Sequence, residues 1–286
     1  MFYSRYIYNL LLLIKSIKHI YLVLALVGLS VGIYAQGGKL HFKQHEVGLF
    51  LGGQYYIGDL NPSAHFNQTQ PAIGVFYRYT PNYRYAFRGG FNYGSIQGDD
   101  SQSNDADQIQ RNLNFKSTMY ELHALAEFNF LEYRISHDKY KFTTFLFLGI
   151  SGYYFNPQAQ AGGRWVNLQP LKTEGETKPY KRYQMSIPFG IGMKMNVSKQ
   201  VGIGIEWGPR KTFTDYLDDV SGTYPNFSLI KGVDAKTIAL SDRSKNAGSN
   251  VNEQRGNPRT KDWYMYFGLT LNFKLTIKPE PCYKSN

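Results

Sequence analysis

The sequence predicts an all-β protein, an eight-stranded antiparallel up-and-down transmembrane β-barrel of the outer-membrane type. Eight segments alternate residue by residue between apolar and polar or small side chains, the pattern of strands whose two faces meet different surroundings. The connections between these segments alternate between short and long. After Ile33 no apolar run could span a membrane as a helix, and a closed barrel is the other structure that satisfies every backbone group in lipid.

The first 35 residues are expected to be a secretory signal peptide. Arg5, Lys15 and Lys18 precede an apolar run over 20–33, and Ala35 is a small residue at the expected cleavage position. A membrane anchor is the alternative, but the run is shorter than the roughly 20 residues that a spanning helix needs. We therefore expect a barrel over 36–275 and a periplasmic C-terminal tail over 276–286.

The alternation is clearest at residues 83–94, "YRYAFRGGFNYG". Tyr83, Tyr85, Phe87, Phe91 and Tyr93 share one parity, and a glycine interrupts them once. On a helix these aromatic residues would scatter around the cylinder, and each glycine would cost about 1 kcal/mol relative to alanine. In chain order the eight expected strands cover 47–57, 72–79, 83–94, 120–130, 140–155, 183–196, 201–208 and 262–274.

The lengths of the connections predict the orientation of the barrel. Those near 80–82, 131–138 and 197–200 are short, whereas those near 97–112, 156–180 and 215–260 are long and polar. The link over 58–68 is intermediate and begins with the turn signal "DLNP". Because outer-membrane barrels have short periplasmic turns and long outer loops, we expect both termini in the periplasm.

The apolar faces are expected to contact outer-membrane lipid. Ten strand residues at about 3.3 Å each, tilted near 40°, rise roughly 25 Å, which is the height of a barrel's apolar band. The apolar sets contain no Lys or Arg, and either would cost about 2 to 4 kcal/mol at the bilayer midplane. A lipocalin-like soluble barrel is the alternative. Aromatic residues gather near strand ends, as interfacial girdles do: Tyr55, Tyr56, Tyr77, Tyr79, Tyr83, Tyr93, Tyr183, Trp207 and Trp263.

The polar faces are expected to form an ion-paired interior network. An eight-stranded barrel is just wide enough for side chains to fill its lumen, so side chains of both signs should pair there and close it. A proton or solute path through the same lumen is the alternative. The expected interior residues are Arg84, Arg88, Glu121, His123, Glu127, Lys194, Glu206 and Asp262.

The sequence offers little support for catalysis, and we expect no enzyme, cofactor or metal. No histidine belongs to an H-E-x-x-H or comparable ligand spacing. His123, flanked on its face by Glu121 and Glu127, could act as a base or a ligand, but a hydrogen-bonded place in a polar interior is the favoured interpretation. Asp215, Asp218 and Asp219 resemble loose calcium ligands, although capping and turning at a barrel rim explains them better.

Charge and cysteine content restrict the partners. The net charge of +11 comes from dispersed Lys and Arg residues, which does not indicate nucleic-acid binding in an exported chain. Cys282 is the single cysteine, so no internal disulfide framework exists. In an oxidising periplasm it could form an intermolecular disulfide, or it could be incidental to the tail.

Three stretches resemble a known family: "GGQYYIGDLNP" (52–62), "EWGPRKTFTDYLDDVSGTYP" (206–225) and "KDWYMYFGLTLNFK" (261–274). Together they are similar to PorG-like outer-membrane β-barrel proteins of Bacteroidota, a component of the type IX secretion system. The resemblance implies a subunit associated with the periplasmic ring of a PorK-type lipoprotein and PorN, and with other secretion-system subunits. It implies a role in protein transport and, in gliding species, in gliding motility, and it brings no catalytic residues.

A closed lumen would leave the ends of the barrel as the surfaces for such partners. The candidates at the periplasmic end are the turns 133–138 and 197–200 and the tail, with Lys278, Lys284 and Cys282. The competing hypotheses are a generic adhesion or structural barrel that acts through its outer loops, and a small-solute channel.

Overall fold

The computed structural model describes residues 43–137, 139–230 and 232–276. The chain divides into two units, Met1–His41 and Phe42–Asn286, and all described residues belong to the second. The predicted signal peptide (1–35), Cys282 and nearly all of the predicted tail lie outside the described residues, and so these predictions remain open.

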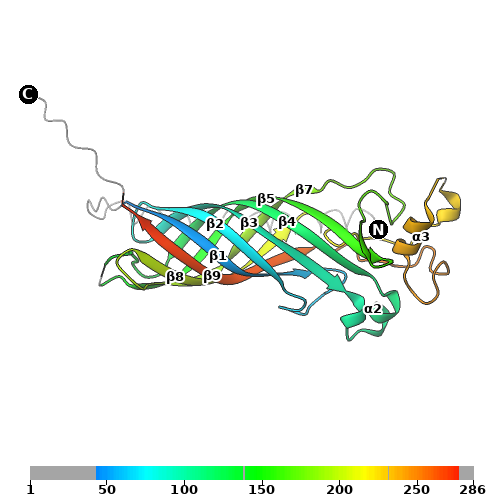
Figure 1. The fold of residues 1–286 in the computed structure, drawn as a ribbon, viewed down its shortest axis with the longest axis horizontal. Helices are drawn as coiled ribbons and strands as arrows, with labels where there is room; N and C mark the ends of the chain where they lie inside the picture. Colours follow the sequence, from blue (N-terminus) through cyan, green and yellow to red (C-terminus); the bar gives the residue numbers. More distant parts are fainter. Residues whose placement is uncertain (1–42, 138, 231, 277–286) are drawn as a thin grey trace, which may run out of the picture. The chain divides into compact units, whose positions relative to one another are not determined.

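The second unit is a closed antiparallel β-barrel of eight strands (Figure 1). Neighbouring strands pair in the order β4-β3-β2-β1-β9-β8-β7-β5, and β4 also pairs with β5, which closes the barrel. This confirms the predicted fold class. The barrel strands are β1 (Gln44–Ile57), β2 (Gln70–Thr80), β3 (Tyr85–Asp99), β4 (Asn114–Asn129), β5 (Phe142–Ala161), β7 (Tyr183–Asn196), β8 (Val201–Thr212) and β9 (Trp263–Leu275).

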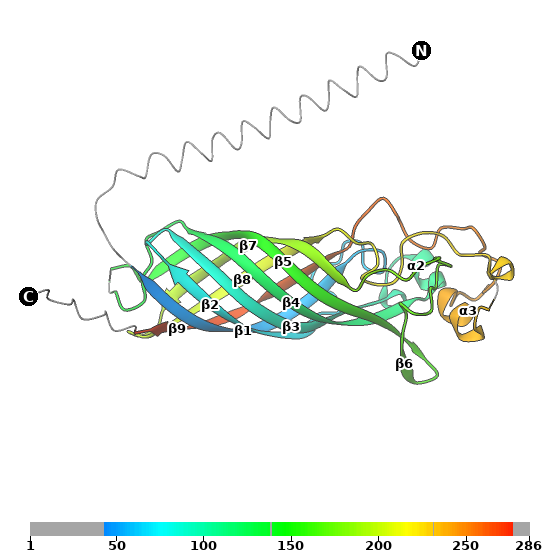
Figure 2. The same ribbon diagram turned by 90° about the horizontal axis from the view of Figure 1, so that it is seen from above.

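The remaining elements lie in the connections. The short strand β6 (Arg164–Asn167) pairs only with the end of β5, where the two form a hairpin (Figure 2). Among the described residues there are also two short helices, α2 (Ala106–Arg111) and α3 (Ala235–Ser241), and two 3₁₀ turns, η2 (Asp100–Gln102) and η3 (Phe227–Leu229). Asp105 and Asp234 cap the two α-helices, because each carboxylate accepts a hydrogen bond from a first-turn N–H.

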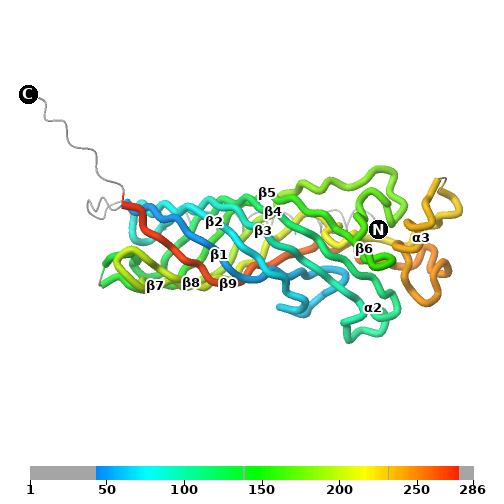
Figure 3. Tube along the Cα trace, viewed as in Figure 1, coloured from blue at the N-terminus to red at the C-terminus, as the bar shows by residue number. Residues whose placement is uncertain are grey.

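The two ends of the barrel differ, as the connection lengths predict (Figure 3). One end, here called the short-turn end, holds the turns 81–84, 130–141 and 197–200, together with the start of β1 and the end of β9. The other, here called the long-loop end, holds 58–69, 100–113, 162–182 and 213–262, together with both α-helices. Strands such as the 20-residue β5 are longer than a membrane crossing needs, so they carry the barrel wall beyond it.

The two faces of the wall have opposite chemistry. Large apolar side chains point outward and are exposed: Leu122 is 67% exposed, and Leu148 and Ile150 are 59% exposed. Charged side chains point inward and are buried, as Arg78, Glu121 and Glu127 illustrate. A soluble protein does not leave a continuous belt of this kind in water, whereas lipid is its natural solvent.

Several predicted strand bounds differ from the structure by one to six residues, and the start of β3 has a clear local cause. The strand expected from Tyr83 begins at Tyr85, because Asn82 turns the chain first. The Asn82 side-chain oxygen accepts hydrogen bonds from the backbone N–H groups of Arg84 and Tyr85, both at 2.9 Å. Because of this Asx turn, Tyr83 and Arg84 do not belong to β3, although the apolar alternation includes them.

Candidate functional site: the closed lumen and its outer plug

The interior at the short-turn half of the barrel is organised around Glu127 on β4. Its carboxylate lies 3.0 Å from Arg78 Nε, 3.2 Å from Arg88 Nε and 2.8 Å from Lys194 Nζ. These cations come from β2, β3 and β7, so one carboxylate connects strands from different sides of the barrel. All four side chains are buried.

One further ion pair crosses the lumen, and another joins the neighbouring strands β1 and β2. Arg88 Nη1 on β3 donates to Glu206 on β8 at 2.6 Å, although three strands separate β3 from β8 in the sheet. Arg78 Nη1 donates to Glu46 on β1 at 2.8 Å and to the Asn272 side chain on β9 at 2.7 Å. Charge-assisted bonds of this length occupy the space through which a solute would have to pass.

A second group surrounds Glu121, which lies six residues before Glu127 on β4 and therefore on the same inward face. Its carboxylate lies 3.3 Å from Arg210 Nε on β8 and accepts a hydrogen bond of 2.7 Å from the Tyr264 hydroxyl on β9. Asn92 on β3 donates to it at 3.1 Å. Four strands therefore converge on this carboxylate as well.

Aromatic rings fill the remaining volume and contact the cations. The guanidinium groups of Arg78 and Arg88 lie 5.0 and 5.1 Å from the Phe76 ring centroid. Lys194 Nζ lies 4.6 Å from the centroid of Phe145, and the Arg210 guanidinium lies 4.5 Å from that of Tyr266. Cation–π contacts partly compensate the loss of water around each buried charge.

The charges of the two groups balance. Four cations (Arg78, Arg88, Lys194, Arg210) face four carboxylates (Glu46, Glu121, Glu127, Glu206). A buried charge without a partner is strongly destabilising, and here each one is paired. The arrangement therefore seals the lumen and leaves no excess charge in it to attract an ion.

The structure places most of the predicted interior residues in these two groups. Arg88, Glu121, Glu127, Lys194 and Glu206 belong to them, and His123 lies beside Glu121. Asp262 is buried, but it lies at the long-loop end in a separate cluster.

Arg84 does not point into the lumen. It lies in the turn before β3, and its guanidinium donates to the backbone oxygen of Phe130 at the short-turn end. The interior prediction for Arg84 is therefore corrected, and the cause is the Asn82 turn described above.

Three participants were missing from the prediction: Glu46, Arg78 and Arg210. Arg78 has the inward parity of the 72–79 strand, Glu46 lies one residue before a predicted strand, and Arg210 lies two residues after one. Inward parity alone would have found Arg78, and extending two alternations by one or two residues would have found Glu46 and Arg210.

His123 occupies an incompletely bonded position. Its Nδ1 lies 3.3 Å from a Glu121 oxygen, but neither ring nitrogen has an aligned hydrogen-bond partner. Glu127, the other carboxylate considered for it, is engaged by the three cations. The geometry therefore offers no chain of proton donors and acceptors around this ring.

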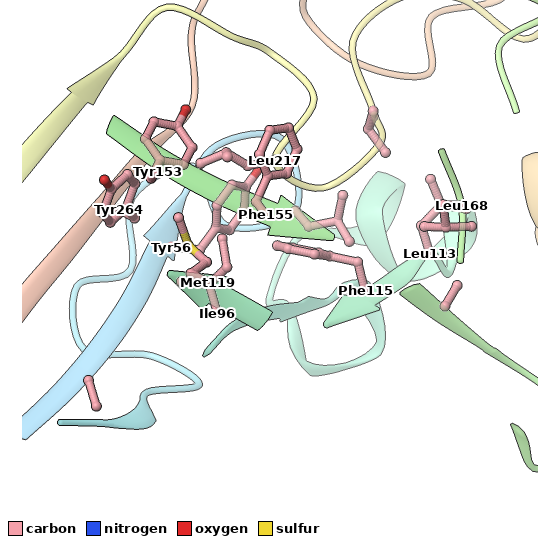
Figure 4. Close-up of a cluster of buried hydrophobic side chains, with 14 of the residues drawn as sticks. Tyr56, Ile96, Leu113, Phe115, Met119, Tyr153, Phe155, Leu168, Leu217 and Tyr264 are labelled. Carbon is pink, nitrogen blue, oxygen red and sulfur yellow. The ribbon is translucent and has the colours of Figure 1, made fainter. Parts of the chain in front are cut away.

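The half of the barrel towards the long-loop end is closed by an apolar core (Figure 4). Wall residues such as Tyr56, Phe115, Met119 and Phe155 pack there with Leu217, which comes from the loop after β8. Leu217 and its neighbour Val220 are almost completely buried. Residues 213–222, here called the plug segment, thus fold into the mouth of the barrel.

A carboxyl pair ties the plug segment to the wall. The Tyr56 hydroxyl donates to Asp218 and lies 3.1 Å from Asp262 Oδ1. Because a hydroxyl has one hydrogen to donate, the second contact requires a proton on a carboxyl group. Burial, and then the negative charge of Asp262, raises the pKa of Asp218 well above its usual range, and burial does the same for the pKa of Asp262.

Further polar contacts hold the plug segment from its outer side. Asp219 accepts hydrogen bonds of 2.5 Å from the hydroxyls of Thr173 and Tyr180, and burial raises the pKa of Asp219 to about 7. Arg255 donates to the Asp219 backbone oxygen at 2.6 Å and pairs with Glu174 at 2.9 Å. These partners come from the two longest loops, so the loops lock the plug segment in place.

The three aspartates that resemble calcium ligands therefore face different partners. Asp215 accepts from the Ser221 hydroxyl at 2.7 Å, Asp218 accepts from the Tyr56 hydroxyl, and Asp219 accepts from the Tyr180 hydroxyl. Within the described part of the chain, no group of three His, Cys, Asp or Glu side chains is arranged to hold a metal ion. Within the same part, no helix is both long and apolar enough to cross a membrane.

Comparison with known proteins gives the following findings. A family described as a domain of unknown function (DUF6089) matches residues 19–238. No curated protein matches the chain. Among solved structures, the chain is similar to Ail, the attachment invasion locus protein of Yersinia pestis, with 11% identity and a TM-score of 0.40 over 82% of this chain and 99% of that one.

Two other solved structures are similar in the same way. Neisserial surface protein A (NspA) has 10% identity and a TM-score of 0.38, covering 81% of this chain and 97% of that one. The outer membrane protein OprG of Pseudomonas aeruginosa has 9% identity and a TM-score of 0.35, covering 81% and 94%. The present protein is an eight-stranded antiparallel barrel with an apolar exterior and an ionised, filled interior.

Proposed function

Because the chain belongs to the DUF6089 family, whose description assigns no activity, we propose its function from its own geometry: a non-enzymatic outer-membrane subunit that acts by docking other proteins. The single observation that carries this proposal is the closure of the lumen. Ion pairs cross it in the inner half, and the plug segment fills its outer half. A barrel without a passage acts through its two ends.

The finer proposal is a subunit of the type IX secretion system that anchors a periplasmic ring at the outer membrane. It rests on the resemblance to PorG-like proteins, carried mainly by residues 206–225. In the structure this stretch supplies Glu206 and Arg210 to the lumen and Leu217 and Asp218 to the plug segment. A PorK-type lipoprotein and PorN are the proposed partners, and the short-turn end and the tail over 276–286 are the proposed docking surfaces, on the periplasmic side.

Cross-linking in native membranes, followed by affinity purification of the full chain, tests this proposal. We expect ring proteins of the secretion system to co-purify with the wild-type barrel. Deleting residues 276–286 should leave a folded barrel with the anomalous gel mobility of unboiled samples, but should weaken recovery of the ring. Recovery of the ring at the wild-type level from the deletion variant would contradict a docking role for the tail, and recovery of no secretion protein at all would contradict the finer proposal.

An adhesion role for the long-loop end is the second candidate. It is favoured by large apolar side chains that the folded outer loops expose: Trp165, Leu229 and Ile238. Replacing these three by serine should abolish cell or matrix binding if the protein is an adhesin, and should leave ring recovery unchanged if it is a secretion anchor.

A channel role is testable in planar bilayers. The sealed lumen predicts no stable conductance for the purified wild-type protein. Large stable pores would contradict the closure on which the docking proposal rests.

A further inference from the structure

The net positive charge of the described residues is concentrated at one end of the barrel. The interior carries four cationic and four anionic groups. The long-loop half, comprising 58–69, 97–116, 156–182 and 211–262, carries fourteen Lys or Arg and fourteen Asp or Glu among its described residues. The excess therefore lies at the short-turn end.

That end carries seven basic residues, here called the cationic collar. Lys43 and Lys274 belong to the chain ends of the barrel, Arg84 to the first turn, Arg134, Lys139 and Lys141 to the second turn, and Lys199 to the third. Glu132 is the only acidic residue among the described positions of these turns, and Asp138 lies outside the described residues. A surface with this imbalance attracts anions.

The collar contains a small polar hollow. The hollow has a volume of about 180 Å³ and lies between the second and third turns, where Ser136, His137 and Lys141 face Ser198 and Lys199. Two ammonium groups, the Ser198 hydroxyl and the His137 ring on one small concavity are donors suited to phosphate oxygens, whereas the Ser136 hydroxyl already donates to the Lys199 backbone oxygen. Several water-sized volumes of about 30 Å³ fit in it, so a phosphate group does too.

The surroundings of the hollow identify the source of the phosphate. Exposed apolar side chains stand directly beside its lysines: Phe142 follows Lys141 and is 43% exposed, and Val197 is 61% exposed two residues before Lys199. The ring of Tyr140 is also close, with Lys139 Nζ 5.7 Å from its centroid. Basic, aromatic and apolar residues follow one another in this way at the level of lipid headgroups.

We propose that this hollow binds the phosphate of an anionic phospholipid, such as phosphatidylglycerol, in the membrane leaflet at the short-turn end. The lipid's acyl chains then lie against the exposed apolar belt above the hollow, and the collar draws further anionic headgroups around the rim. An acidic protein would use the lysines but would leave Phe142 and Val197 without an apolar partner, so the lipid accounts for more of the surface.

The test measures the lipid preference of the full chain in phosphatidylcholine vesicles with trace spin-labelled lipids. The fraction of immobilised label gives the relative association of phosphatidylglycerol and phosphatidylcholine with the barrel. For the wild type we expect phosphatidylglycerol to be preferred by about fivefold, the effect of roughly one surface charge pairing. Lys141→Gln/Lys199→Gln should reduce the preference to less than twofold.

A matched variant controls for net charge. Lys178→Gln/Lys236→Gln removes two exposed lysines from the long-loop end and should keep the wild-type preference. Lys199→Gln alone, at an exposed turn position, should give an intermediate preference and protects the test against misfolding of the double variant. Retained gel mobility of unboiled samples shows that each variant is folded.

Three outcomes would overturn the proposal. The first is a wild-type protein without a preference for phosphatidylglycerol, which would leave an acidic protein as the occupant of the collar. The second is an equal loss of preference in the collar variant and the long-loop variant. The third is complete loss of the preference in 10 mM inorganic phosphate with the wild-type chain, which would assign the hollow to the free ion.

Discussion

Glu127 offers the sharpest test of the closed interior. Its carboxylate is shared by Arg78, Arg88 and Lys194 within 3.2 Å, and all of these side chains are buried. Glu127→Gln keeps the shape of the side chain and removes its charge. Arg78 and Arg88 retain Glu46 and Glu206, whereas no other carboxylate pairs with Lys194 among the described residues.

The expected loss follows from this uncompensated lysine. Removing one partner of a buried ion pair costs about 3 to 5 kcal/mol, because the charge that stays behind has lost both water and its counter-ion. The three contacts are not additive, so we expect a loss of the same size and not three times as large. Adding Lys194→Met should recover part of it, because the buried charge left unpaired is then removed.

The measurement is the free energy of unfolding of the full chain in lipid vesicles, from urea titrations followed by tryptophan fluorescence and by gel mobility. Glu253→Gln is the matched control, since Glu253 is exposed in an outer loop and its substitution should stay within about 0.5 kcal/mol of the wild type. If Glu127→Gln costs no more than Glu253→Gln, or if the added Lys194→Met makes the protein still less stable, the ion-paired seal is not what holds the interior together.

Three further predictions concern the exterior and the plug. Leu148→Lys, on the outward face of β5, should destabilise insertion by about 2 to 4 kcal/mol. Leu229→Lys is the control: Leu229 is also exposed (81%), but it lies in a long loop, so this substitution should have little effect. The folding yield in vesicles measures both variants, and equal effects would argue against a lipid-facing wall. Leu217→Ala should cost about 2 to 5 kcal/mol through the cavity that it leaves in the outer core, and it should speed proteolysis of the plug segment; an unchanged cleavage rate would contradict the packing. Burial raises the pKa of Asp219 to about 7, so the stability that its protonated form contributes is complete at low pH and is lost as pH rises through 7. The urea midpoint of the wild type should therefore decrease from pH 5 to pH 8, and it should decrease less in Asp219→Asn. A midpoint that increases over this range would contradict this assignment.

Local alternation was sufficient to predict the wall of the barrel but not the roles of particular side chains in it. Parity alone places Tyr55 in the outer aromatic girdle, yet Tyr55 is fully buried. The loop after β1 folds back so that His65 lies 3.1 Å from the Tyr55 hydroxyl and Phe66 packs on its ring, while Trp207 donates to the same hydroxyl at 2.9 Å. Such coverage depends on where a loop returns, and no period in the sequence records it.

The pairing of interior charges was likewise beyond the sequence. Inward parity selected Arg88 and Glu206 as interior residues, but 118 positions separate them and their strands are not neighbours. Their contact follows from the curvature that closes β4 onto β5, which brings distant strands face to face across the lumen. Asp262 lies apart from the other predicted interior residues because it directly precedes β9, at the long-loop end of the closed barrel.

The sequence by itself determined the strands, the two chemistries of their faces and the alternation of short turns with long loops, because a side chain's face in a strand depends only on its parity. The tertiary structure alone decided that the lumen is shut by particular cross-barrel pairs and that residues 213–222 fill the mouth. It also decided that the excess positive charge surrounds the short-turn end. These features depend on distances between residues far apart in the chain, which exist only once the barrel has closed.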